Sequence, residues 1–283
     1  MQEAAEYAIL STTKATTATA PPPATPAPLL APVTPAIPAT GVTVAPDRPL
    51  SRQEFYRQQY RRSHHWKDSL ALYCEVIDRY VEADTYVLDI GCGHGDFLAP
   101  VYSKTPHTYG VDPDAQALAK NTILRNTVVG SAEVLPFPDN FFDLVVSAWV
   151  LEHLERPEQA FREMYRVLKP GGRVIFLTPN TWNYNVWIIR LIPNCFHNFF
   201  TRRLYNRQEH DTYPVRYKVN SPRKVDRTLL PLGFKKAQLI LNGDPTYISF
   251  NAPLYALACA IERLLNLKWL NVARVHLIGV YQK

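Results

Sequence analysis

The sequence has few cysteines and no pattern that would organise them. The four cysteines are widely separated and form no C-x-x-C pair: Cys74, Cys92, Cys195 and Cys259. This spacing argues against a zinc cluster and against the disulfide framework of small secreted proteins. We therefore expect reduced cysteines, no metal site and a cytoplasmic location.

Targeting signals and membrane spans are also lacking. Glu3 and Glu6 stand where a signal peptide has its basic region, and no arginine precedes Arg48, which argues against a transit peptide. The best apolar candidate, residues 252–265, carries two charged residues and is shorter than the roughly 20 residues of a membrane span. We interpret it as a buried core helix.

The composition is that of a globular protein with a mildly basic balance. The chain has 283 residues, of which 47% are hydrophobic and 20% charged, so it can bury a full core. A net charge of +6 is compatible with nucleic acid, an anionic membrane surface or an acidic substrate as partner, and selects none of them.

The first fifty residues differ from the rest. Residues 12–46 are mostly Ala, Thr and Pro, which bury little area and remove backbone donors, so residues 1–50 are expected to be a disordered tail. Ser51 and Glu54 form a capping-box pattern that starts a helix. The helix is basic and contains Tyr56 and Tyr60, so it is either a solvated face or a cover over a ligand pocket.

Residues 51–283 read as one α/β domain. Strands are expected at 85–90, 107–112, 126–130, 143–147, 173–178, 234–241 and 275–281, and helices near 96–102, 114–120, 157–168, 221–230 and 253–265. Short apolar strands that alternate with helices predict a doubly wound, Rossmann-like sheet with helices on both faces. A Lys-Pro-Gly-Gly turn at 169–172 is expected to separate a helix from a strand.

An aromatic segment at about 179–220 interrupts this alternation. Insertions of this length are more often functional than idle. Because this segment is aromatic and apolar, we interpret it as a lid over an acceptor of apolar character, and Arg202 and Arg203 follow its aromatic part directly. A lipid-linked or glycan-like acceptor, or one reached at a membrane surface, fits this composition, so peripheral membrane contact is part of the prediction.

The strongest local pattern is a glycine-rich turn that follows an apolar strand. Residues 87–95 read VLDIGCGHG, and such glycines permit positive φ and close backbone approach to a ligand. Asp112 ends the next expected strand, where a carboxylate accepts hydrogen bonds from ribose hydroxyls. The turn lacks the residues of a phosphate-binding loop, so a nucleoside without phosphates is expected. Asp89 suits the cationic amino group of a methionine moiety.

Four blocks resemble the class I S-adenosylmethionine-dependent methyltransferases, in particular the branch that acts on small molecules. They are residues 87–95, GVDPD at 110–114, GSAEVLPFPD at 130–139 continuing to Asp143, and LKPGG at 168–172. The resemblance covers about residue 51 onward. It implies S-adenosylmethionine as cofactor and a seven-stranded sheet whose last strand, at 275–281, is antiparallel.

The resemblance also implies which residues bind the methionine and ribose parts of this cofactor. Asp89, Gly91 and Gly93 would line the methionine end, and Cys92 between the glycines is counted with them. Asp112 would bind the ribose hydroxyls.

On the adenine side, the resemblance places Pro113 near the ring and Ser131, Ala132 and Glu133 around it. Trp149 would lie near the adenosyl or methionine portion. The family often has an acid where this chain has Ser131. Because a hydroxyl accepts a hydrogen bond more weakly than a carboxylate, a weaker contact to the adenine amino group is expected.

Methyl transfer needs a general base only when the acceptor must lose a proton, as a hydroxyl does. His153 follows the fourth expected strand at a position where the family often has histidine, and His210 has acidic neighbours in the insertion. We name both as candidate bases. The alternatives are a structural hydrogen-bonding role for His153 and a surface loop for His210.

These observations predict an S-adenosylmethionine-dependent methyltransferase for a small-molecule, glycan or lipid-linked acceptor, with oxygen as the acceptor atom. Nucleic acid is not expected as a partner. The alternatives are an RNA or protein methyltransferase, for which the basic helix would supply phosphate contacts, and a catalytically silent nucleoside-binding protein. A nicotinamide-dependent oxidoreductase is disfavoured by the glycine spacing.

Overall fold

The computed structural model describes residues 51–64, 66–184, 186 and 214–283. The expected tail at 1–50 and most of the insertion, including His210, lie outside the described residues.

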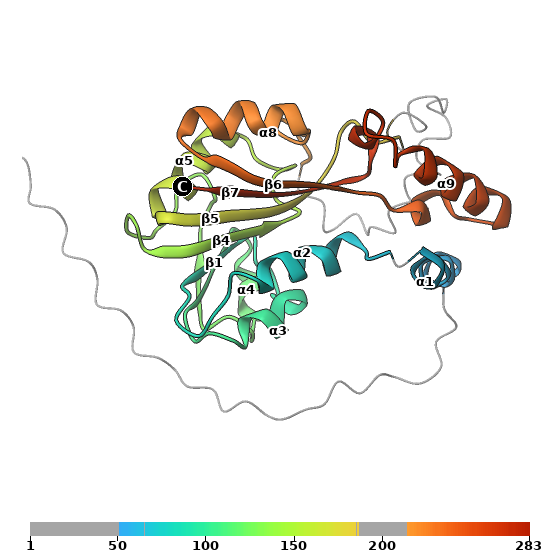
Figure 1. Cartoon of the computed structure of the whole chain (residues 1–283). Coiled ribbons are helices and arrows are strands. Elements are labelled where there is room, and N and C mark those ends of the chain that lie inside the picture. Colours follow the sequence, from blue (N-terminus) through green and yellow to red (C-terminus); the bar gives the residue numbers. More distant parts are fainter. Residues whose placement is uncertain (1–50, 65, 185, 187–213) are drawn as a thin grey trace, which may run out of the picture. The chain divides into compact units, whose positions relative to one another are not determined.

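A seven-stranded mixed sheet forms the centre of the domain (Figure 1). Its strands are β1 (Val87–Ile90), β2 (Thr108–Asp112), β3 (Asn126–Val129), β4 (Phe142–Ala148), β5 (Leu168–Pro179), β6 (Lys235–Asn242) and β7 (His276–Gln282). They lie in the order β3-β2-β1-β4-β5-β7-β6. The first five pair in parallel, and β7 is antiparallel to β5 and to β6. The predicted fold is therefore confirmed, including the antiparallel last strand.

Helices cover both faces of the sheet. The described α-helices are α1 (Arg52–His64), α2 (Ser69–Asp78), α3 (Ala99–Tyr102), α4 (Ala115–Ala119), α5 (Pro157–Val167), α8 (Pro222–Leu229) and α9 (Ala252–Leu264). Short 3-10 turns are η1 (Asp96–Leu98), η3 (Leu230–Leu232), η4 (Pro245–Ile248) and η5 (Asn271–Ala273). Figure 1 shows α5 and α8 on one face of the sheet and α2, α3 and α4 on the other. None of the described helices is long and apolar enough to cross a bilayer.

Two apolar layers result from the alternation of side chains along the strands. Leu88 and Phe176 pack with Phe161 of α5 on one face. Val87 and Ile175 pack with Tyr73 and other residues of α2 on the opposite face. Since both faces are covered, the polar ends of the strands, rather than their faces, remain available for a ligand.

The start of β5 differs from the prediction. The residues expected to form a turn at 169–172 belong to a strand that begins at Leu168, with an irregular register against β4. The backbone N–H of Gly171 donates to the carbonyl of Lys283 (3.2 Å), and the N–H of Lys283 donates to the carbonyl of Gly172 (2.9 Å). This pairing with a distant segment makes the turn part of the sheet, and local sequence does not reveal it.

The helix start predicted at Ser51 is confirmed, since its Oγ accepts a hydrogen bond from the N–H of Glu54 (3.1 Å). The aromatic residues of this region pack against the C-terminal part of the chain. Tyr56 stacks on Tyr255 with ring centroids 4.5 Å apart, and Nε1 of Trp66 donates to the carbonyl of Gly243 (2.8 Å).

The interpretation of residues 252–265 as a buried core helix is wrong. In α9 the side chains of Leu257 and Leu264 are 52% and 58% exposed, whereas Ala258 and Glu262 are buried. The helix packs through one narrow side on a small apolar cluster that includes Ile248 of η4. Composition alone predicted burial, but it does not determine which side of a helix meets the rest of the fold.

Candidate functional site

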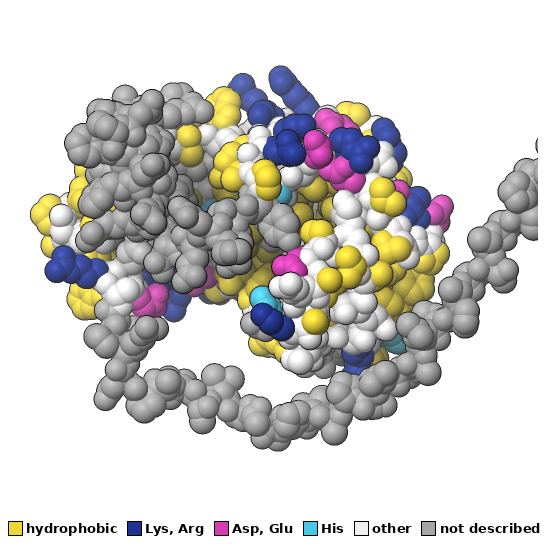
Figure 2. All heavy atoms as spheres, turned by 180° about the vertical axis from the view of Figure 1, so that it is seen from behind, with side chains coloured by type: hydrophobic (Ala, Val, Ile, Leu, Met, Phe, Trp, Pro, Cys, Tyr) yellow, Lys and Arg dark blue, Asp and Glu magenta, His cyan; other side chains and the backbone are white. Residues whose placement is uncertain are grey.

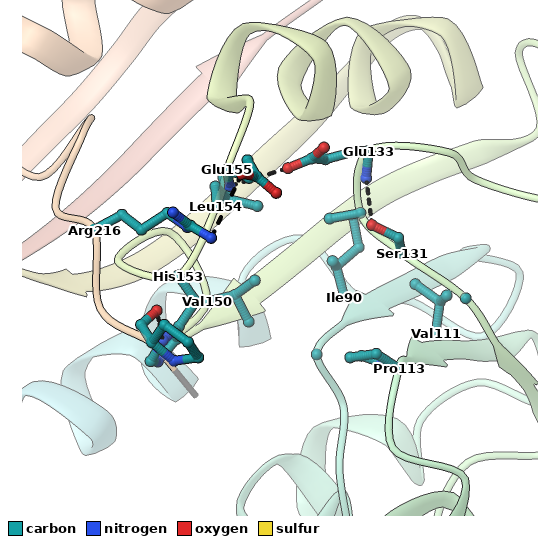
Figure 3. A pocket seen from close by; sticks show the side chains of 14 residues that line it. Ile90, Val111, Pro113, Ser131, Glu133, Val150, His153, Leu154, Glu155 and Arg216 are labelled. Carbon is teal, nitrogen blue, oxygen red and sulfur yellow. Dashed lines mark hydrogen bonds and ion pairs between the residues drawn. The ribbon is translucent and has the colours of Figure 1, made fainter. Parts of the chain in front are cut away.

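Fourteen residues line a pocket at the carboxyl ends of the parallel strands, here called the edge pocket (Figure 3). They are Ile90, Gly91, Val111, Pro113, Gly130, Ser131, Ala132, Glu133, Val150, His153, Leu154, Glu155, Pro214 and Arg216. Figure 3 shows Val150 and His153 on one side of the opening, with Ile90, Val111 and Pro113 on the other. Ligands of doubly wound folds bind at this edge.

The glycine turn after β1 contributes Gly91 to the lining of the edge pocket. Gly91 has φ +73°, its N–H donates to the carbonyl of Val111 (2.8 Å), and a Cβ at this position would overlap the side chain of Val150. Gly93 has φ +45°, and a Cβ there would meet no atom within 4 Å. Backbone at Gly93 therefore faces open space, as close approach of a ligand requires.

Asp112, at the end of β2, is fixed beside this turn. One carboxylate oxygen accepts the N–H of Gly93 (2.9 Å) and the other accepts the N–H of Asp114 (2.8 Å). A carboxylate has about four acceptor positions, so each oxygen retains one for a further donor. Two adjacent hydroxyl groups, as in ribose, match that remaining capacity.

Asp89 lies deeper than the sequence suggests. Its side chain is 2% exposed and accepts a hydrogen bond from the hydroxyl of Tyr102 (2.6 Å) on α3. Burial raises the pKa of Asp89 to about 7, the Tyr102 hydrogen bond lowers it, and the nearby Asp112 raises it further. A cationic ligand group close to this carboxyl would favour its ionised form.

Cys92, between Gly91 and Gly93 of the turn, is a buried packing residue. The thiol of Cys92 is buried beneath Gly110, where a Cβ would lie 2.6 Å from its Sγ, and burial raises the pKa of that thiol.

Trp149 follows β4 with φ +60°, and its ring meets that of His276 edge-on at 5.0 Å. A bulky residue with positive φ is strained, and such strain concentrates at functional sites.

Glu133 lines the edge pocket but has partners of its own. Its carboxylate accepts the backbone N–H groups of Glu155 (3.0 Å) and Arg156 (2.8 Å) and the Nε of Arg156 (2.7 Å). Burial raises the pKa of Glu133, but these hydrogen bonds outweigh it and the net direction is downward. Glu133 therefore joins the loop after β3 to the start of α5.

His153 has an orientation that fits a base. Its Nδ1 lies 3.2 Å from the carbonyl oxygen of Pro214. Since a carbonyl only accepts, Nδ1 is the donor in this contact. The carbonyl of Glu152 accepts the N–H groups of Arg216 (2.7 Å) and Tyr217 (3.1 Å), so the segment from Pro214 is attached to this loop.

The structure brings most of the predicted residues to one place. Gly91, Pro113, Ser131, Ala132, Glu133 and His153 line the edge pocket. Asp89, Cys92, Gly93, Asp112 and Trp149 are not among its lining residues, although Asp112 contacts Gly93 in the turn. Their roles toward a cofactor stay predictions.

Asn121 was missed by the sequence analysis. Its amide nitrogen donates to the carbonyl of Gly93 (2.9 Å), and its oxygen accepts the N–H groups of Ile123 and Leu124 (both 3.1 Å). It thus fixes the glycine turn from a loop 28 residues further along the chain. A lone asparagine in a loop has no sequence pattern that announces such a contact.

The residues present fit S-adenosylmethionine. The two carboxylate oxygens of Asp112 offer hydrogen-bond acceptors beside the open glycine turn. Val111, Pro113 and Leu154 supply apolar walls to the edge pocket. No lysine or arginine occurs in the turn at 91–95, so the turn suits a nucleoside better than a phosphate group.

The comparisons with known proteins agree with this geometry. Residues 88–176 match the family model described as "Methyltransferase domain". Curated relatives include a protein of Encephalitozoon cuniculi named as a methyltransferase (37% identity over 118 residues), and a demethylmenaquinone methyltransferase of Listeria welshimeri (33% over 139 residues). We therefore assign residues 88–176 to the methyltransferase domain family.

These matches cover part of each protein. The first covers 40% of this chain and 52% of the relative, and the second covers 43% and 59%. The chain thus spans little more than half the length of these relatives. Among solved structures, an S-adenosylmethionine-dependent methyltransferase from Mesorhizobium loti aligns with a TM-score of 0.48 at 19% identity, over 76% of this chain and 98% of that one.

Proposed function

We propose that this protein transfers the methyl group of S-adenosylmethionine to a small-molecule acceptor. The observation that carries the proposal is the edge pocket itself. Gly91, at the start of the glycine turn, lines it together with His153, and Asp112 contacts the same turn at Gly93. A cofactor site and a candidate base therefore share one opening.

The chain's own residues have separable tasks. Asp112 binds the ribose hydroxyls, and Pro113 and Ala132 contact the adenine. The bound cofactor supplies an already activated methyl group, so the protein mainly orients the acceptor and excludes water. His153 is proposed as the base that accepts the proton of an acceptor hydroxyl, and oxygen is proposed as the acceptor atom on that basis.

The acceptor class is proposed as lipid-linked or glycan-like. Relatives named demethylmenaquinone methyltransferase support an acceptor with apolar character. A C-methyltransferase of ubiquinone and menaquinone biosynthesis from Cupriavidus taiwanensis (34% identity over 124 residues, 51% of that protein) is a reason to test carbon as well as oxygen.

Cofactor binding is tested by calorimetric titration with S-adenosylmethionine and, separately, NAD. We expect binding of S-adenosylmethionine alone, weakened at least about tenfold in Asp112→Ala through loss of charge-assisted hydrogen bonds. The matched control is Asp78→Ala, which removes an exposed carboxylate paired with Lys104. Binding of NAD, or no S-adenosylmethionine binding by folded protein, would contradict the proposal.

Acceptor class and base are tested by following labelled methyl groups from S-adenosylmethionine into small-molecule, RNA and protein fractions. We expect label in the small-molecule fraction. His153→Gln should lower kcat about a hundredfold and leave the Kd for the cofactor unchanged, because it removes the base and not the binding site. Label in RNA or protein, or cofactor binding without transfer to any fraction, would contradict the proposal.

A further inference from the structure

The solvent-facing side of α9 is apolar. Residues at 253, 256, 257, 260 and 264 are spaced by three and four, so they form one face of the helix, and all are exposed proline, alanine or leucine. Leu267 lies in the turn that follows the helix and is also exposed. Leu257, Leu264 and Leu267 are 52%, 58% and 47% exposed, and Trp269 just beyond the helix is 73% exposed. A helix of a soluble domain normally turns its leucines inward.

The helix is fixed in this orientation from its other side. Glu262 is buried and lies against Gly243, and its carboxylate accepts a hydrogen bond from the hydroxyl of Tyr184 (3.3 Å). Asn251 caps the helix by accepting the N–H of Leu254 (3.0 Å). The leucines can turn inward only if these contacts are lost, so their exposure follows from the packing of α9.

The exposed charged residues within this stretch of the sequence are basic. Between Ala252 and Arg274 the basic residues are Arg263, Lys268 and Arg274, and the only acid of this described stretch is the buried Glu262. Arg263 and Lys268 are exposed. At the end of the molecule where Figure 1 places α9, Figure 2 shows hydrophobic and basic side chains, with some acidic ones nearby.

We propose that this face of α9, with Trp269 and Lys268, docks on an anionic membrane surface. Leucine side chains enter the boundary of the acyl chains, tryptophan lies at the level of the headgroups, and basic residues meet anionic lipids. A second copy of the chain fits less well. Symmetric pairing would bring Arg263 and Lys268 near their own copies, with no exposed acid on this stretch to offset the repulsion.

α9 lies at the same edge of the sheet as the edge pocket. The helix lies between the end of β6 and the start of β7, and His276 at that start pairs with Pro179 at the carboxyl end of β5. α9 therefore follows the same edge of the sheet as the one that carries the edge pocket. The docking itself does not depend on which acceptor is methylated.

The test is co-sedimentation of the full chain with vesicles of phosphatidylglycerol and phosphatidylcholine in equal parts, compared with phosphatidylcholine alone. We expect binding to the anionic vesicles. Leu264→Asp with Leu267→Asp should lower the partition coefficient at least about tenfold through loss of apolar burial, and Arg263→Gln with Lys268→Gln by about fivefold for each charge. The control is Leu230→Asp, which changes a 46% exposed leucine of η3.

Folding of each variant is checked by S-adenosylmethionine titration and thermal unfolding, so failure of the docking proposal is distinguishable from failure of the proposed function. Contact of Trp269 is followed by quenching with brominated lipids, which we expect to diminish in Trp269→Phe. Equal sedimentation of the Leu264/Leu267 variant and wild type would overturn the proposal. A dimer that dissociates on Leu264→Asp would also overturn it and assign the face to a second copy.

Discussion

Gly91 shows how a single residue combines backbone and packing constraints. It has φ +73°, and a Cβ would overlap Val150. We expect Gly91→Ala to lower the free energy of unfolding by about 2–4 kcal/mol, because backbone strain adds to overpacking. Urea denaturation measures this change.

Gly171 is the matched control for that experiment. It has a similar φ of +82°, but the nearest atom to its Cβ position is the Gln282 side chain at 3.8 Å. Gly171→Ala should therefore lower the free energy of unfolding by about 1–2 kcal/mol, because it adds backbone strain without overpacking. Val150→Ala in the Gly91→Ala background should recover part of the loss. Equal losses for the two single glycine variants would show that Val150 does not constrain the turn.

Asp89 predicts a pH dependence of stability. Its pKa is raised from 3.8 to about 7 by burial in the folded state, so the unfolded chain releases the proton more easily. The contribution of protonated Asp89 to the free energy of unfolding is therefore fully present below about pH 4, and it is lost as the pH rises through about 7. Asp89→Asn should remove this part of the decline, as measured by urea denaturation from pH 4 to pH 8.

Two further variants separate Asp89 from other groups. Tyr102→Phe removes the hydrogen bond that lowers the pKa of Asp89, so it should move the midpoint of the decline to higher pH. Burial also raises the pKa of Glu262 to about 7, and Glu262→Gln measures that separate contribution. If Tyr102→Phe moved the midpoint downward, this account of Asp89 would be wrong.

At the scale of elements, the start of α4 is coupled to the candidate cofactor site. The side chain of Asp114 accepts the N–H groups of Gln116 (2.8 Å) and Ala117 (3.1 Å), while its own N–H donates to Asp112 (2.8 Å). Asp114→Ala should cost about 1 kcal/mol of stability through loss of the cap and leave the cofactor Kd within about twofold.

Asp114→Pro tests the contact between α4 and Asp112, because proline removes both the capping side chain and the backbone N–H that donates to Asp112. We expect calorimetry to show a Kd for S-adenosylmethionine about tenfold weaker than that of Asp114→Ala. Equal Kd values for the two variants would show that the backbone of the cap does not support the ribose-binding carboxylate.

Sequence predicted most elements because short apolar strands and capping residues act locally. Each expected strand is present, and Asp112 and Gly93 meet as the order of β1 and β2 requires. The outward leucines of α9 and the attachment of Glu133 to Arg156 were not predictable, since both depend on partners brought close only by the completed fold.

At the scale of the whole molecule, Lys283 connects several segments. Its Nζ donates to Oδ1 of Asn140 and to the carbonyls of Tyr165 and Leu168, each at 2.8 Å. Lys283→Met leaves these acceptors without that partner, and we expect it to lower the free energy of unfolding by about 1–3 kcal/mol. Thermal and urea unfolding report the loss.

An exposed lysine provides the comparison. Lys104 pairs with Asp78 at 2.5 Å while both side chains are at least 40% exposed. Lys104→Met should therefore change stability by less than about 1 kcal/mol. If the two lysine variants lost equal stability, Lys283 would contribute no more than an ordinary surface ion pair.

The insertion of β7 between β5 and β6 has a consequence for the synthesis of the protein. Until residues 276–282 leave the ribosome, β5 has an unpaired edge and β6 has no neighbour in the sheet. Unpaired edges of partly folded chains recruit strands from other chains. Nascent chains that stall before His276 are therefore expected to need protection by chaperones, whereas chains in which residues 276–282 have left the ribosome close their own sheet.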